Sequence, residues 1–312
     1  MTNILNRREF LQAGAVAGTS LALSKVLFAA GKKSLLVFTK SSGFEHDVVK
    51  NVGGKPSILE NAVITLGEKY GFDVTATKDG TIFDAKDFRK HAAILFFTTG
   101  DLTTVGTDKN PPISPQGKQS LLDAIHGGLG FVGVHAASDT FHTPPDDDNE
   151  HANRYIAHGD KSDPYLRMLG GEFITHGSTP RLQDANIVVN DPKFPGIEGV
   201  SSPVTFNEEW YSLKDFRTDL HVILTLDTKG MTGEPYQRAP YPMTWARMEG
   251  KGRVFYTAIG DRPENWSNPF FLNLLGGGIR WAIGEVKASL DHNLTQAAPG
   301  YAEIPPKPKP KT

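Results

Sequence analysis

Short apolar runs alternate with segments of helical periodicity along the first half of the chain. Strands are predicted at 34–39, 72–77, 92–98 and 131–135, where the chain carries short, largely apolar runs. Helices are predicted in the segments between them, at 56–70, 85–90 and 114–127. Ser114 and Pro115 supply an N-cap and a first-turn proline for the last of these helices. Strands joined in this order by helices are typical of a parallel, doubly wound sheet.

The second half of the chain contains more predicted strands than helices. Strands are predicted at 185–189, 203–213, 221–226, 241–247 and 252–259, the last two joined by a hairpin at 248–251. A short helix is predicted at 165–170 and a closing helix at 268–283. The predicted fold class is therefore α/β and flavodoxin-like. It has a mostly parallel central sheet, helices on both faces and an antiparallel extension in the C-terminal half.

The first thirty residues have the layout of an export signal. Arg7 and Arg8 precede a mildly apolar stretch at 13–30, as in twin-arginine signals. The alternative is an amphipathic N-terminal helix. We predict a signal at 1–30, an α/β domain at 31–285 and a proline-rich solvated tail at 286–312. The expected location is the periplasm or another exported compartment. The twin-arginine export machinery is then a partner. A membrane is expected as a partner only if the signal stays uncleaved and tethers the chain to it.

Composition narrows the chemistry that the chain can perform. It has 312 residues, no cysteine and a formal net charge of −2. The absence of cysteine excludes disulfides, thiolate metal sites and cysteine nucleophiles. The charge balance disfavours nucleic-acid binding. Ser41, Ser42 and Gly43 form a loop too poor in glycine for a convincing phosphate site, and neither a nucleotide nor a flavin is expected.

Polar residues follow the predicted parallel strands where these strands end. His135 comes at the end of a buried strand and before a run of small residues, where related α/β folds carry a strand-to-helix turn. His46 follows the first strand, and Gly100 and Asp101 follow the third. Carboxyl ends of parallel strands share one edge of the sheet, so His46 and His135 are candidates for one pocket.

Two segments of the second half add candidates. His176 ends a short strand-like run, and Glu208 and Glu209 stand beside Trp210 and Tyr211. Strict alternation sends the two glutamates to opposite faces, so at most one is expected to face a pocket while the other is solvated. The alternative is an edge strand that carries a protective charge.

The other histidines carry weaker signals. His142, His151 and His158 lie in or beside the acidic stretch 143–163, which is predicted to form a long surface loop or lid that borders the site. The remaining four are interpreted as structural or exposed, namely His91, His126, His221 and His292.

These motifs together resemble those of the ThuA-like (trehalose utilisation) family. The resemblance rests on 43–46, 130–135, 170–176, 209–211 and 252–256, and covers roughly 34–284. It implies a class I glutamine-amidotransferase-like fold in which His135 takes the position of the nucleophile, so glutamine hydrolysis is excluded. It also implies a role in disaccharide use, on sugars oxidised at C3. Asp261 stands where family members often carry a histidine, and must replace that residue if it serves the site.

We hypothesise a metal-assisted hydrolase or lyase that acts on 3-keto glycosides or disaccharides. The metal, a divalent ion such as zinc or manganese, is expected on His46, His135, His176 and Glu209. His135, His46 and Glu209 are the predicted catalytic residues. The predicted substrate-binding residues are Phe44, Gly100, Asp101, Trp210, Tyr211 and Asp261.

Two other functions stay open at this stage. In the first, the chain is a non-catalytic carbohydrate-binding or accessory protein, in which Trp210, Tyr211, Trp245 and Trp266 stack on sugar rings. In the second, it is a metal-dependent hydrolase of another small molecule, because fold does not determine function.

Overall fold

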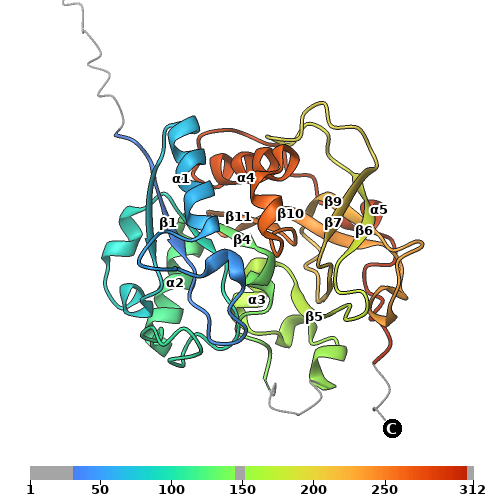
Figure 1. The fold of residues 1–312 in the computed structure, drawn as a ribbon, viewed down its shortest axis with the longest axis horizontal. Coiled ribbons are helices and arrows are strands. Elements are labelled where there is room, and N and C mark those ends of the chain that lie inside the picture. Colours follow the sequence, from blue (N-terminus) through green and yellow to red (C-terminus); the bar gives the residue numbers. More distant parts are fainter. Residues whose placement is uncertain (1–30, 145–151, 308–312) are drawn as a thin grey trace, which may run out of the picture. The chain divides into compact units, whose positions relative to one another are not determined.

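A nine-stranded mixed sheet forms the centre of the computed structural model, which describes residues 31–144 and 152–307 (Figure 1). The strand order is β2-β1-β3-β4-β11-β10-β9-β6-β7. The first five strands of this order are parallel, and the pairs from β11 to β7 are antiparallel. The predicted fold class is confirmed.

The parallel half follows the predicted strands closely. It consists of β1 (Ser34–Phe38), β2 (Asp73–Thr77), β3 (Ala93–Phe96), β4 (Gly130–Val134) and β11 (Gly252–Thr257). The antiparallel half consists of β10 (Tyr241–Glu249), β9 (His221–Asp227), β6 (Gln183–Val189) and β7 (Val204–Glu208). A second, two-stranded sheet pairs β5 (Glu172–His176) with β8 (Tyr211–Lys214).

Helices cover both faces of the parallel half. They are α1 (Ile58–Tyr70), α2 (Pro115–Gly127), α3 (Pro164–Leu169) and α4 (Pro269–Ala282). The short α5 (Leu294–Ala297) instead packs against β9 and β10 in the antiparallel half. In Figure 1, α1 and α4 pack together on one side of the sheet, and α2 and α3 pack together on the other. Every residue of β3 and β4 is buried, which explains why both strands read as uninterrupted apolar runs.

Local capping explains where the longer helices begin. Ser57 and Glu60 form a reciprocal capping box at the start of α1. The Ser114 hydroxyl accepts a hydrogen bond from the Gly117 N–H, and Pro115 follows it at the first turn of α2. The segment predicted as a helix at 85–90 is a single 3-10 turn at Asp87–Lys90.

The predicted strand at 203–213 is wrong, because the structure divides it between two sheets. β7 ends at Glu208 and β8 begins at Tyr211, and the two strands pair with β6 and β5 respectively. Alternation therefore stops at Glu209, and both glutamates are buried. The strand breaks where Glu208 accepts hydrogen bonds from the N–H groups of Glu209 and Gly260. β7 is nevertheless an edge strand of the large sheet.

The segment after α4 is not a solvated tail over its described part. Leu294 and Ala298 are buried, and Asn293 exchanges side-chain hydrogen bonds with the backbone of Val222 on β9. The predicted boundary at 285/286 therefore does not end the packed structure. Residues 308–312 and the predicted signal at 1–30 lie outside the described residues. Among the helices that are described, none is long and apolar enough to span a membrane.

Candidate functional site

His135 lies at the carboxyl end of β4, on the tight turn that the sequence predicts. It begins a 3-10 helix (His135–Ser138) with a φ of 45°, a left-handed conformation that is strained for a residue with a side chain. The imidazole is fully buried, and Nδ1 donates to the carbonyl of Ala258 at 2.8 Å. In the neutral ring the lone pair is therefore on Nε2. That atom finds no hydrogen-bond partner among the described residues.

His46 faces His135 from the loop that follows β1. It is also buried, and the two rings are 5.3 Å apart and nearly perpendicular. Its Nε2 lies 3.4 Å from the Tyr211 hydroxyl, whereas Nδ1 has no partner within the described part of the chain. Burial, with a smaller effect of His135, lowers the pKa of His46 to about 3. His46 is therefore neutral at physiological pH and keeps a lone pair for a ligand.

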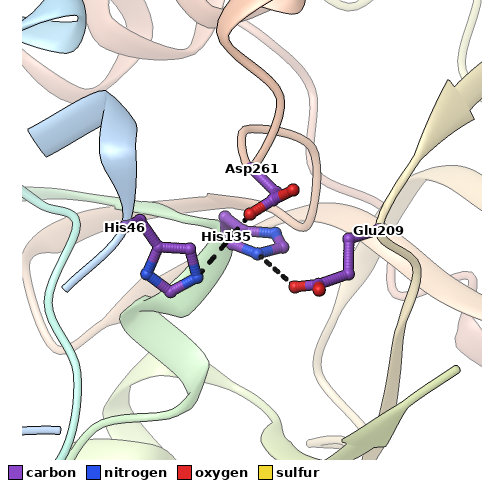
Figure 2. Close-up of side chains that lie close together, drawn as sticks. All are labelled: His46, His135, Glu209 and Asp261. Carbon is purple, nitrogen blue, oxygen red and sulfur yellow. Dashed lines mark ion pairs between the residues drawn. The ribbon is translucent and has the colours of Figure 1, made fainter. Parts of the chain in front are cut away.

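Two carboxylates complete this group, as Figure 2 shows. Glu209 Oε2 lies 3.5 Å from His135 Nε2, and Asp261 Oδ1 lies 3.9 Å from His46 Nε2. Asp261 comes from the loop after β11, so the group gathers residues from the ends of β1, β4, β7 and β11. One potential ligand atom from each of the four residues lies within 4.8 Å of all the others.

Arg181 binds one oxygen of each of these two carboxylates. Its Nη1 donates to Glu209 Oε1 at 2.7 Å and to Asp261 Oδ2 at 2.8 Å. The other oxygen of each carboxylate thereby faces an imidazole. Burial would raise the pKa of Glu209, but His135, His176 and the Arg181 guanidinium together lower it to about 2. Burial would likewise lower the pKa of His135, but the facing Glu209 carboxylate and its neighbours raise it above its usual range.

His176 is not part of the four-residue group. Its side chain is 37% exposed, and Nδ1 lies 2.8 Å from the carbonyl of Gly177. It remains on the wall of the adjacent cavity, 3.5 Å from Glu209. Asp261 takes the fourth place that the sequence analysis had assigned to His176.

A cavity of about 560 Å³ opens beside the group. Its lining comprises Phe44, His46, Asp47, Asp139, Arg154, Phe173, His176, Arg181, Glu209, Tyr211, Asp261 and Pro263. Three of the predicted substrate-binding residues are in this set, namely Phe44, Tyr211 and Asp261. Phe44 is 69% exposed and offers an aromatic face at the cavity.

The other three predicted substrate-binding residues lie outside this lining. Trp210 is fully buried, and its indole N–H donates to the carbonyl of Gln183. Gly100 has a φ of 74°, and a Cβ at this position would lie 2.7 Å from the Gly43 nitrogen. The absence of a side chain at Gly100 therefore allows the loop after β3 to contact the loop after β1. The Asp101 carboxylate is bonded to Thr103.

Several residues that the sequence analysis did not select line or support the cavity. Arg181, Arg154 and Asp139 lie on its wall, and the buried His142 contacts Asp139. His158 also lies close to two acids, Glu172 and Asp215, in a second group with metal-ligand spacing. The Lys214 ammonium is 3.6 Å from Glu172 and 3.9 Å from Asp215, so this second group already contains its own cation. His151 lies outside the described residues.

Comparison with known proteins agrees with this architecture. The family model ThuA, described as trehalose utilisation, matches residues 34–282. A ThuA-like protein from Bacteroides uniformis superposes with a TM-score of 0.57 at 18% identity, covering 83% of this chain and 95% of that one. One from Parabacteroides merdae gives 0.52 at 18% identity, covering 89% and 98%. No curated protein matches the sequence significantly. The chain belongs to the ThuA family, which is related to trehalose utilisation.

Proposed function

We propose that this chain is an exported enzyme that cleaves glycosides or disaccharides already oxidised to a ketone at C3. The observation that carries the proposal is the convergence of His46, His135, Glu209 and Asp261 beside the cavity. His46 and His135 each keep a buried ring nitrogen without a hydrogen-bond partner among the described residues. Unpartnered buried polar groups are costly, and ionisable groups in such surroundings gather at functional sites. The cavity volume lies within the range of small-molecule sites.

The four side chains fit a divalent cation such as zinc or manganese. Imidazole nitrogen and carboxylate oxygen are ligands that both ions accept. The fit rests on His135 Nε2, a fully buried atom that no other described residue bonds. A buried polar atom left in this way costs about 1–3 kcal/mol. When bound, the cation would supply positive charge for the oxygen at C3 of the substrate.

The protein's own groups hold and shape this site. Arg181 fixes the two carboxylates through one oxygen each, and the Ala258 carbonyl fixes the tautomer of His135. Phe44, whose side chain is exposed at the cavity, presents an aromatic face on which a sugar ring can stack. These contacts orient the substrate relative to the polar group and exclude water from one of its sides.

The 3-keto group makes elimination possible. Removing the proton from C2 leaves an enolate over C2, C3 and O3. Expulsion of the aglycone then breaks the C1–O bond and forms a C1–C2 double bond. Water adds its hydroxyl to C1 and its proton to C2, so the net reaction is hydrolysis. An unoxidised sugar lacks the acidified C2–H and is not expected to react.

The carbohydrate-binding alternative loses its main support. Trp210, Trp245 and Trp266 are all buried, and each indole N–H donates to a backbone carbonyl. These three side chains are core residues and do not offer stacking surfaces. Binding without turnover remains an outcome of the test.

The test is cleavage of a 3-keto disaccharide by the purified full-length protein. Cleavage of the 3-keto sugar but not of its parent, lost with a chelator and in His135→Ala, supports the proposal. His126→Ala is the matched control, because the His126 side chain is 70% exposed and its backbone contacts the hairpin before β11, at the opposite end of that strand from Asp261. Binding without turnover would indicate an accessory protein. Metal-dependent cleavage of esters or amides instead would indicate another hydrolase.

The export part of the proposal rests on Arg7 and Arg8. Residues 1–30 fused to a reporter enzyme that folds before export are expected to carry it out of the cytoplasm. Lys substitution of both arginines is expected to stop this transport. A reporter that stays in the cytoplasm with the natural sequence would contradict the proposal.

A further inference from the structure

Asp139 lies on the cavity wall just after the 3-10 turn that carries His135. Its side chain is 19% exposed, and Oδ1 is 2.5 Å from His142 Nε2 and 3.2 Å from Arg154 Nη1. The same cavity is lined by His46, Glu209 and Asp261, so the carboxylate shares its space with the four-residue group. Asp139 is thus a half-buried carboxylate on the wall of the substrate cavity.

A second carboxylate supports Asp139 from behind. The other ring nitrogen of His142, Nδ1, lies 3.1 Å from Glu172 Oε1. Glu172 in turn accepts hydrogen bonds from the Thr143 N–H and hydroxyl. Both nitrogens of His142 therefore face carboxylate oxygens, which only accept, so the ring donates on both sides as an imidazolium. Burial would lower the pKa of His142, but these two carboxylates raise it.

Among the described residues that line the cavity, four are carboxylates, and three have other roles. Glu209 and Asp261 belong to the four-residue group and are bound to Arg181. Asp47 is 76% exposed and is paired with Lys50 at 2.7 Å. Of these four carboxylates, Asp139 alone both lines the cavity and is held by His142, Arg154 and Glu172, a network that does not use the four-residue group.

We propose that Asp139 is the general base that removes the proton from C2, with His142 and Glu172 as positioning residues. This inference rests on the proposed function. The C2–H bond breaks, its electron pair enters the enolate and the proton passes to the Asp139 carboxylate. When the C1–O bond breaks, Asp139 returns the proton to the departing oxygen. An aspartate can serve as a base of this kind when the enolate oxygen is stabilised elsewhere in the site.

The test compares Asp139→Asn with Asp47→Asn in the full-length chain. Asp47 is the matched control, because it is the same residue type on the same cavity without the buried partners. Exchange of the C2 hydrogen for deuterium is followed by NMR on a 3-keto disaccharide, alongside cleavage, metal content and thermal unfolding. We expect Asp139→Asn to lose exchange and cleavage by about 10²- to 10⁴-fold with unchanged metal content. Asp47→Asn is expected to match the wild type.

Variants of His142 test the positioning role, and they keep the proposal testable if Asp139→Asn does not fold. His142→Ala is expected to lower kcat with little change in KM, and His142→Gln, whose amide can still donate to Asp139, is expected to recover part of the loss. Equal activity of His142→Ala and wild type would overturn the role of His142. Wild-type cleavage with normal exchange in a folded Asp139→Asn would overturn the Asp139 assignment alone. Wild type without exchange or cleavage would overturn both this inference and the proposed function.

Discussion

Replacing Glu208 with alanine is expected to destabilise the fold more than the loss of an ordinary carboxylate. Glu208 Oε1 accepts from the Glu209 N–H at 2.8 Å, and Oε2 accepts from the Gly260 N–H at 2.9 Å. Oε2 also accepts from the Asn265 side-chain amide at 2.8 Å. Each of these donors is buried, and the two backbone N–H groups belong to Glu209 and to the neighbour of Asp261. Glu208 thus joins the two loops that carry the carboxylates of the site.

Glu208→Ala leaves those two backbone N–H groups without their acceptor. At about 1–3 kcal/mol for each buried unpaired group, the expected loss of unfolding free energy is about 2–6 kcal/mol. Urea unfolding of the variant and the wild type measures this difference. Glu264→Ala is the matched control, because Glu264 is exposed and makes one surface ion pair with Arg262, worth less than about 1 kcal/mol. A loss below 1 kcal/mol in Glu208→Ala would refute the reasoning.

Three further changes test other parts of the structure. Arg181→Ala removes the hydrogen bonds that hold one oxygen of Glu209 and one of Asp261. It is expected to weaken the binding of a metal ion by about 10- to 100-fold, measured by competition with a chelator. Unchanged metal binding would argue against an orienting role for Arg181. Gly100→Ala places a Cβ 2.7 Å from the Gly43 nitrogen at a φ of 74°, and should lower the melting temperature more than Gly127→Ala, whose Cβ meets nothing within 4 Å. Burial would raise the pKa of Asp219, but the Arg247 guanidinium holds it below its usual range. The pair therefore stabilises the fold above the unfolded-state pKa of about 3.9 and loses this effect as the pH falls through the folded-state value. Urea midpoints should separate wild type from Asp219→Asn at pH 7 and converge towards pH 3; an equal separation at both would contradict the ion pair's contribution.

The parallel half of the fold could be predicted from local sequence because its inner strands, β1, β3, β4 and β11, are almost entirely buried. Continuous apolar runs such as those of β3 and β4 identify the strands, and the segments between them identify the crossovers. That pattern also places His46 and His135 at one edge of the sheet, which the structure confirms. The strand break at Glu209 could not be predicted, because it depends on the hydrogen bond that the Gly260 N–H, far along the chain, donates to the Glu208 carboxylate.

The other parts of the site could not be predicted either, because they too depend on contacts between segments that are far apart in the sequence. Arg181 lies in a polar connection with no local pattern, and its importance comes only from contact with Glu209 and Asp261. His142 looked like a loop residue, and its buried place depends on Glu172 in another segment. The segment after α4 looked solvated by composition, yet Leu294 packs against the sheet. In each case long-range contacts decide what local periodicity cannot.

The central claim is that His46, His135, Glu209 and Asp261 form a cation-binding catalytic centre. Elemental analysis of the folded, exported protein, repeated on His135→Ala, tests this claim most directly. We expect one divalent metal ion per chain in the wild type and in His126→Ala, and none in His135→Ala. A wild-type protein that is purified without chelator and holds no metal, even after incubation with zinc or manganese, would contradict the claim.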